Sequence, residues 1–478
     1  MASPPSTTPA GQVSGEGYKK SLGRRHVQMI AIGGAIGVGL FMGSGGRLAT
    51  TGPALVFSYL IAGGIAYLLM RALGELVMYR QTSGSVVSYA AELFGPKGAF
   101  ISGWMYVLNW ILSGIAELIA IGLYFQFFFP NVPVLASALC AVLLLVAINL
   151  FSAKAFAEFE FWAAFVKVAA ILLFLAVGIY LVASNAQIGG HQASVGNLFI
   201  GEHGHGGMFP RGFFVAILAL NSVIFAYNAI ELVGVAAGEM EHPEKEVPTA
   251  IRTVILRILV FYVGSVALLA MLLPWNEYQA GQSPFVTVFE RMGLGWIGGV
   301  MNLVVITAAL SSCNSGLYSI SRILRTMSLN GHAPKLLGRM NRNHVPAAGI
   351  ITVASLFLAG VVLNIWLGAS YAFDLALNLA SIGALGTWGS IFACQLMLRR
   401  IKGRVSSLPM PGAPVTGWVG LGSLLAILVL LAFDTMAKDD GSVFHIGLYT
   451  VALVPALALA LAIGWRFVRG RTRSVVEF

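Results

Sequence analysis

The sequence predicts an all-α integral membrane protein with about twelve transmembrane helices, and three observations support this fold class. Hydrophobic residues make up 58% of the 478 residues and charged residues only 10%, with a mean hydropathy of +0.83, whereas soluble domains carry roughly 25% charged residues. About twelve segments are apolar over the ~20 residues that a membrane-spanning helix needs. Lysine and arginine are concentrated in every second connection between these segments. This composition excludes a soluble globular fold.

The apolar segments follow one another along almost the whole chain. Each is bounded by charged residues, prolines or clusters of small polar residues, which end a hydrophobic run. The expected membrane helices cover residues 27–48, 54–78, 99–128, 133–151, 160–183, 212–237, 252–274, 295–325, 346–366, 371–397, 415–434 and 444–467.

The basic residues predict the orientation, because cytoplasmic loops carry the excess of Lys and Arg. With the N-terminus inside, the inner side holds Lys19, Lys20, Arg24, Arg25, Lys97, Lys154, Lys245, Lys335, Arg339, Arg342, Arg399, Arg400, Lys402, Arg404, Arg466, Arg469, Arg471 and Arg473. The outer side holds only Arg47, Arg211, Arg291 and Lys438. We therefore expect a multi-pass protein of the bacterial plasma membrane with both termini in the cytoplasm. The net charge of +10 then reflects the inner loops and indicates no nucleic-acid partner.

Several functional classes have no support in the sequence. The first residues are rich in Pro, Ser and Gly and contain no apolar core, so we expect a disordered tail and no cleavable signal peptide. The three cysteines lie far apart, and His191, His203 and His205 belong to a Gly-rich polar loop, so we expect no metal and no cofactor. No nucleotide-binding loop or nucleophile elbow is present, which argues against an enzyme and against ATP-driven transport.

The first segment, "IAIGGAIGVGLFMGSGG" over residues 30–46, contains seven glycines. Each glycine costs a helix interior up to about 1 kcal/mol relative to alanine. One interpretation is close helix packing, since Gly33-x-x-x-Gly37 and Gly39-x-x-x-Gly43 fit that motif. The other is a broken helix whose free N–H and C=O groups line a cavity.

A second interrupted helix is expected five helices later. The middle of "NSVIFAYNAIELVGVAAGE", residues 221–239, places Asn221, Asn228 and Glu231 at mid-membrane depth, where a charge costs at least about 2.5 kcal/mol. Two interrupted helices at matching places indicate an inverted-repeat transporter with its substrate site between the breaks. Free N–H groups at a half-helix N-terminus suit a carboxylate, and exposed carbonyls suit an ammonium group. The pair is therefore expected to bind an α-amino acid.

Six stretches resemble the bacterial amino acid transporter family of the amino acid–polyamine–organocation superfamily. They are "GGAIGVGLFMGSG" (33–45), "RALGELVMYRQTSGSVVSYAAELFGP" (71–96), "GWMYVLNWILSGIAELIAIGLY" (103–124), "FAYNAIELVGVAAGEMEHPEKEVPTAI" (225–251), "LLPWNEYQAGQSPFVTVF" (272–289) and "ALSSCNSGLYSISRILRTMSLNGHAPK" (309–335). The resemblance covers nearly the whole chain. The stretches 71–96 and 272–289 are most similar to members that transport L-asparagine.

This resemblance implies a LeuT-type fold of five plus five inverted helices, with discontinuous helices 1 and 6 and two appended C-terminal helices. The implied segments are a cytoplasmic tail over 1–26, a first repeat over 27–183, an external loop over 184–211, a second repeat over 212–398, two further helices over 399–468 and a cytoplasmic tail over 469–478.

The resemblance also implies the residues of the substrate site. The Ala35 carbonyl and the N–H groups of Val38 and Gly39, next to Gly37, would line the first break. The carbonyls of Phe225 and Asn228 would take the ammonium group, and the Phe225 ring would gate the site. Many relatives have Ser or Thr at the position of Val38, so a hydroxyl contact is absent here.

Lys167 is expected to couple transport to protons. Counted from Glu160, it lies about 10 Å along its helix, so it either extends to the interface or faces the bundle as a buried proton-exchanging amine. In proton-coupled relatives a lysine stands at this position in place of sodium. Glu231 either neutralises Lys167, relays its proton or caps the broken backbone.

Two further groups share helix faces that could line the pocket. Ser113 and Glu117 lie four residues apart and either read the substrate side chain or join helices. Thr307, Ser311 and Ser315 share a face of helix 8, where such residues often connect membrane helices.

We expect a secondary active permease that takes up a neutral amino acid, foremost L-asparagine, with a proton. The pocket offers no uncompensated charge for a basic or acidic side chain. The alternatives are an importer of glutamine, another small neutral amino acid or γ-aminobutyrate, an amino acid exchanger, and a non-transporting amino acid sensor. The expected partners are the amino acid, a proton and the bilayer.

Overall fold

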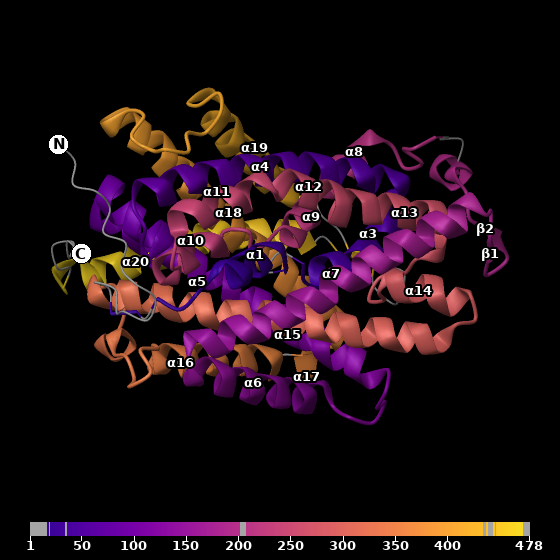
Figure 1. Ribbon diagram of the computed structural model, residues 1–478, viewed down its shortest axis with the longest axis horizontal. Helices are drawn as coiled ribbons and strands as arrows, with labels where there is room; N and C mark the ends of the chain where they lie inside the picture. The colour runs from indigo at the N-terminus through magenta and orange to yellow at the C-terminus, as the bar shows by residue number, and fades with distance from the viewer. Residues whose placement is uncertain are drawn as a thin grey trace.

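The computed structural model is a bundle of long helices that lie side by side along the longest axis of the molecule (Figure 1). The hairpin β1–β2 and α14 lie at its right-hand end, and the C-terminal part of α20 lies at its left-hand end. The structure describes residues 17–18, 20–33, 36–200, 207–362, 364–433, 436–437, 443–444 and 446–471.

All five expected helices of the first half coincide with helical residues. Segment 27–48 is divided into three short helices, and the others are continuous. The elements are α1 (Arg24–Gly33), α2 (Val38–Phe41), α3 (Gly43–Thr51), η1 (Gly52–Ala54), α4 (Leu55–Tyr79), α5 (Ser85–Gln126), α6 (Val134–Phe151) and α7 (Ala153–Ala183). A connection follows with β1 (Gln187–Ile188), β2 (His191–Gln192) and η2 (Val195–Phe199).

The second half repeats this order of a divided helix followed by longer ones. It contains α8 (Phe213–Leu218), α9 (Leu220–Ala226), α10 (Leu232–Ala236), η3 (Ala237–Glu239), α11 (Pro243–Arg252), α12 (Val254–Arg257), the π-helical turn η4 (Ile258–Gly264), α13 (Ser265–Leu272), η5 (Trp275–Glu277), α14 (Pro284–Arg291), α15 (Gly295–Leu329), η6 (Lys335–Gly338), α16 (Ala347–Val362), α17 (Asn364–Leu367) and α18 (Ala369–Lys402). The appended elements are α19 (Val415–Leu431), β3 (Met436–Ala437), β4 (Val443–Phe444), α20 (Ile446–Val468) and η7 (Arg469–Arg471).

The predicted all-α membrane fold class is confirmed. Within the described ranges, eight helices are long and apolar enough to cross a membrane by length and composition, and three shorter apolar helices accompany them. The strands of the described chain form only two antiparallel two-residue hairpins, with Gln187 opposite Gln192 and Met436 opposite Phe444. α5 packs against α15 and α18 and runs through the centre of the bundle.

α5 and α7 both differ from the expected segments, for local reasons. Within α5, Gly95 is not helical, with φ 73° and ψ −171°, so Ser85–Gln126 consists of two helices joined at a kink before Pro96. The second of these helices begins close to the expected residue 99. α7 begins at Ala153 because the Ser152 side chain accepts a hydrogen bond from the Ala155 N–H at 2.9 Å and so caps the first turn.

Part of the segment 1–26, which was expected to be a disordered tail, packs against the rest of the protein. Residues 1–16 lie outside the described residues. Tyr18 and Leu22 are buried, and the N–H groups of Ser21 and Leu22 donate to the Glu239 carbonyl at 3.2 and 3.1 Å. These backbone bonds and the burial of two large apolar side chains fix residues 20–22 against η3.

The described part of the connection 184–211, residues 184–200 and 207–211, packs against the bundle in place of the expected solvated polar loop. Ile188 is buried, and Asn197 donates to the Met271 carbonyl at 2.8 Å, which fastens the loop to the end of α13. His191 lies 3.2 Å from Glu277, whereas His203 and His205 lie outside the described residues. No group of metal-ligating side chains is found in the part of the chain that the structure describes.

Candidate functional site

The first membrane helix is interrupted between Gly33, where α1 ends, and Val38, where α2 begins. Ala35, an expected ligand, lies outside the described residues. Gly37 is extended, with φ −123° and ψ −163°, and its carbonyl accepts from the N–H groups of the third and fourth residues after it. The N–H groups of Val38 and Gly39 belong to the first turn, where helices leave donors without internal partners.

The sixth membrane helix is interrupted between Ala226, where α9 ends, and Leu232, where α10 begins. The Phe225 carbonyl accepts from the Asn228 N–H at 3.0 Å, so one of its two lone pairs is used within the turn. Ala229 has a φ of 74°, an uncommon conformation for a residue with a Cβ. Residues held in this way cluster at functional sites.

Gly39 lies where α2, after the first interruption, packs closely against α9, before the second. A Cβ at Gly39 would lie 2.8 Å from Ala226 Cα and 3.0 Å from Phe225 Cδ1. Because real Cβ atoms essentially never approach other atoms so closely, glycine is what allows α2 to lie against α9. The buried Phe225 ring covers this contact.

α5 connects the two interruptions through two of the expected residues. Ser113 accepts from Asn228 Nδ2 at 3.0 Å, and Asn109 donates to Asn228 Oδ1 at 3.0 Å. One turn further along, Glu117 lies beside the Val38 backbone and Ser312. Its Oε1 is 2.8 Å from the place that a Cβ on Gly37 would take. α5 therefore bonds the side-chain amide of Asn228 at the second interruption and places the Glu117 carboxyl group at the first.

Lys167 is fully buried and faces the bundle. Its Nζ donates to the Ile36 carbonyl at 3.0 Å and to Ser311 Oγ at 2.9 Å. Because α7 begins at Ala153, Lys167 lies about 21 Å along its helix at 1.5 Å per residue. This depth and orientation do not fit an amine extended to the interface, which was one of the two expectations.

Glu160 is a candidate that the sequence reasoning missed. Ser311 donates to Glu160 Oε1, and Asn314 Nδ2 donates to Oε2 at 3.5 Å, so Ser311 joins Glu160 to Lys167. The chain of polar groups continues to Asn149, which donates to Asn314 Oδ1 at 2.7 Å. The available signal was the spacing of seven residues between Glu160 and Lys167, which places both on one helix face.

Glu231 lies apart from this chain of polar groups. It is the N-cap residue of α10 and is buried beside Trp110 and Trp388, and neither carboxyl oxygen makes a hydrogen bond among the described residues. The carboxyl groups that act on Lys167 are those of Glu160 and Glu117. The structure thus brings Lys167, Glu117 and the first break together and places Glu231 elsewhere.

Of Thr307, Ser311 and Ser315, which were expected to share one face of helix 8, only Ser311 hydrogen-bonds side chains of another helix in the described part of the chain. Thr307 donates to the Leu303 carbonyl of its own helix at 2.8 Å. Ser311 is the bridge described above, and Ser315 is buried beside Glu160.

Comparison with known proteins agrees with this geometry. A family model described as amino acid permease matches residues 26–476. An L-asparagine permease of Salmonella typhimurium is 48% identical over 466 residues, which cover 96% of this chain and 91% of the relative. Similar proteins are an L-asparagine permease of Escherichia coli, 47% identical with the same coverage, and one of Streptomyces coelicolor, 48% identical over 95% of this chain and 91% of the relative.

Proposed function

Because this chain belongs to the amino acid permease family, we propose that it takes up L-asparagine together with a proton across the bacterial plasma membrane. The family makes it a multi-pass membrane transporter of amino acids rather than an enzyme. The choice of asparagine is supported by relatives at 47–48% identity that are L-asparagine permeases.

The observation that carries this proposal is the juxtaposition of two interrupted helices with buried polar groups around them. The substrate carboxylate would bind the N–H groups of Val38 and Gly39, and its ammonium group the carbonyls of Phe225 and Asn228. A side-chain amide needs both a donor and an acceptor. Asn109, Ser113 and Asn228 offer both kinds of group.

Glu117 supports a link between substrate and proton. Its carboxyl lies beside Gly37 and Val38, where the substrate carboxylate is expected. Two neighbouring carboxylates cannot both remain ionised at little cost, so a bound substrate favours the protonated form of Glu117. Binding of asparagine would therefore draw a proton into the site.

Lys167 and Glu160 would carry the proton onward. A protonated Lys167 holds the Ile36 carbonyl at the first break, and Ser311 joins its amine to Glu160. Loss of the proton would weaken the hold on Ile36, since charged donors make the stronger hydrogen bonds. The protonation state of Lys167 would thereby control the position of α1 relative to α2.

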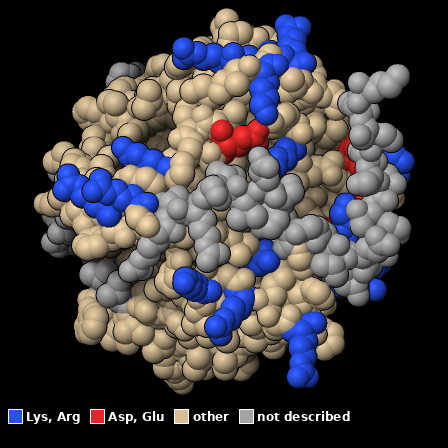
Figure 2. All heavy atoms as spheres, turned by 90° about the vertical axis from the view of Figure 1, so that its left-hand side faces the viewer, with Lys and Arg blue, Asp and Glu red and all other residues tan. Residues whose placement is uncertain are grey.

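The cytoplasm is proposed to face the end of the bundle that carries most basic residues. Figure 2 shows many Lys and Arg and few acidic residues on this end. Basic loops remain on the inner side of a membrane. We accordingly keep both termini inside, together with the segment assignments 27–183, 184–211, 212–398 and 399–468.

The proposal is tested by uptake of labelled L-asparagine into proteoliposomes, with unlabelled competitors and an inward proton gradient. The proposal is supported if the proton gradient drives uptake and if unlabelled asparagine inhibits that uptake more strongly than any other amino acid. Stronger competition by glutamine, another small neutral amino acid or γ-aminobutyrate would reject asparagine as the substrate. Uptake that requires only internal amino acid would identify an exchanger, and binding without uptake would identify a sensor.

A further inference from the structure

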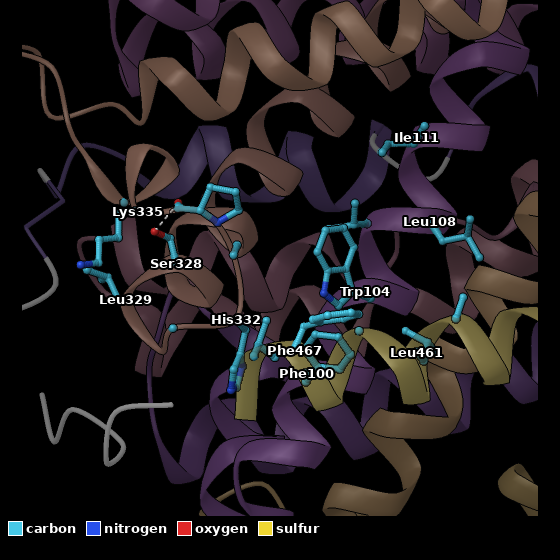
Figure 3. Close-up of a pocket in the computed structure, with 18 of the residues that line it drawn as sticks. Phe100, Trp104, Leu108, Ile111, Ser328, Leu329, His332, Lys335, Leu461 and Phe467 are labelled. Atoms are coloured by element: carbon cyan, nitrogen blue, oxygen red, sulfur yellow. Dashed lines mark hydrogen bonds between the residues drawn. The ribbon is translucent and has the colours of Figure 1, made fainter. Parts of the chain in front are cut away.

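A large open cavity lies at the periphery of the bundle, and no residue of the two interruptions lines it. It has a volume of about 1030 Å³ and is bordered by α5, α20 and the residues that follow α15. Figure 3 shows Lys335 at one end of the group of lining residues and Ile111 at the other. Pockets for small ligands measure about 300–1,000 Å³, so this cavity lies at the upper limit of that range.

The long walls of the cavity are apolar. Phe100, Trp104, Leu108 and Ile111 line it from α5, and Leu457, Ala460, Leu461, Gly464 and Phe467 line it from α20. The lining residues 100–111 extend along about 16 Å of helix at 1.5 Å per residue. The most apolar part of α20 has no buried residues, so this wall is covered by no other helix within the described part of the chain.

The mouth of the cavity is basic. Lys335 and Arg339 line it and are exposed, and neither forms an ion pair within the described part of the chain. Ser328 donates to the Pro334 carbonyl at 2.8 Å and fixes the loop that carries them (Figure 3).

His332 adds a buried polar group without a partner. It is 2% exposed, and neither ring nitrogen has a hydrogen-bond partner among the described residues. The rings of Phe100 and Trp465 hold its imidazole edge-on, each with a centroid distance of 5.9 Å. Burial lowers the pKa of His332, so the neutral ring offers one donor and one acceptor.

We propose that this cavity binds one anionic phospholipid, with its phosphate between Lys335 and Arg339 and its acyl chains along α5 and α20. Basic pockets between membrane helices at the level of the headgroups bind lipids of this class. A small water-soluble anion would leave the apolar walls uncovered, whereas an uncharged lipid would leave Lys335 and Arg339 without an anionic partner. A glycerophospholipid satisfies both parts.

The test measures lipid binding to the delipidated full chain by native mass spectrometry. Phosphatidylglycerol and phosphatidylcholine with identical oleoyl chains are the probes. The variant Lys335→Gln/Arg339→Gln should bind phosphatidylglycerol about 30-fold more weakly than the native chain, because two basic contacts are removed. The matched control Lys97→Gln/Arg342→Gln removes two exposed basic residues that do not line the cavity and should change little.

A second variant tests the apolar walls without changing charge. Ala460→Phe places a ring inside the cavity and should also abolish the preference for phosphatidylglycerol; Leu108→Phe serves if Ala460→Phe does not remain monodisperse. The proposal would be overturned if Lys335→Gln/Arg339→Gln and the control Lys97→Gln/Arg342→Gln lost the same amount of phosphatidylglycerol affinity. It would also be overturned if the native chain bound phosphatidylglycerol and phosphatidylcholine equally well. Undiminished phosphatidylglycerol binding in the filled variants would place the lipid elsewhere and overturn it as well.

Discussion

At the scale of single residues, the most important group is the buried amine of Lys167, together with the polar groups that contact it. A charge at the middle of a membrane costs at least about 2.5 kcal/mol. Lys167 offsets this cost through the Ile36 carbonyl, Ser311 and the nearby carboxyl groups of Glu160 and Glu117. Since Ile36 belongs to the first interruption, the state of this amine acts directly on the backbone that would hold the substrate.

Glu160→Gln should separate proton coupling from substrate movement. The amide keeps the shape of the side chain but cannot take a proton, so gradient-driven accumulation of asparagine should fall at least about tenfold, or about 1.4 kcal/mol. Exchange of internal for external asparagine should persist. Glu290→Gln, which changes an exposed carboxyl group on α14, is the control and should accumulate normally. Normal accumulation in Glu160→Gln would exclude Glu160 from the proton path.

Ser113→Ala should weaken recognition of the substrate amide. The change removes the acceptor of the Asn228 Nδ2 hydrogen bond and leaves a buried donor unpaired, which costs about 1–3 kcal/mol. We expect KM for asparagine to rise about tenfold, measured by concentration-dependent uptake. Ser137→Ala is the control, because Ser137 donates only to the Val134 carbonyl of its own helix. An unchanged KM would assign Ser113 a purely structural role.

At the scale of elements, transport depends on two half-helices that meet where no Cβ can be accommodated. α2 and α9 approach each other at Gly39 and Ala226, and α5 contacts both interruptions. The last turn of α1 is in turn held by Arg257 on α12, which donates to the Ala31 carbonyl. Movement of α1 therefore requires changes on α7, α12 and α15 together.

Gly39→Ala should force these two half-helices apart. Overpacking of this kind costs about 1–3 kcal/mol, so the solubilised protein should melt at a lower temperature and asparagine uptake should be lost. Gly64→Ala is the control, because a Cβ there meets nothing within 4 Å and alanine favours a helix. If Gly39→Ala melted at the native temperature and took up asparagine at the native rate, the close approach of α2 and α9 at Gly39 would be contradicted.

The sequence predicted the elements better than the side-chain network. Glycine runs and mid-helix polar residues predicted both interruptions, because their helix penalties are local. The bridge from Lys167 to Glu160 was missed since Ser311 comes from another helix, and pairing across 144 residues leaves no local pattern. The early start of α7 was missed because Lys154 and Glu158 marked an apparent polar boundary, whereas the Ser152 cap set the real one.

At the scale of the whole molecule, one end of the bundle is closed by the N-terminal segment. Arg322 and Glu239 form a fully buried ion pair of 2.7 Å, and Tyr318 donates to the same carboxylate at 3.0 Å. The Arg322 guanidinium lies 5.7 Å from the Tyr18 ring, and the Glu239 carbonyl accepts from Leu22. Opening this end requires separation of α15, η3, Tyr18 and residues 20–22.

Arg322→Met should destabilise this closed end. Removal of one partner leaves the Glu239 carboxylate buried without its counter-charge, which costs about 3–5 kcal/mol. The melting temperature of the solubilised protein should fall clearly below that of the control Arg252→Met, in which the replaced arginine is exposed on α11. Equal melting temperatures would show that the ion pair does not hold the end closed.

The role of Lys167 can be measured as uptake of labelled asparagine into proteoliposomes that contain Lys167→Ala, with and without an inward proton gradient. Lys154→Ala, on the same helix and exposed, is reconstituted in parallel. We expect gradient-driven uptake in the native chain and in Lys154→Ala, and no response to the gradient in Lys167→Ala. Equal stimulation of all three proteins by the gradient would contradict the assignment of Lys167 as the group that couples the proton to the substrate site.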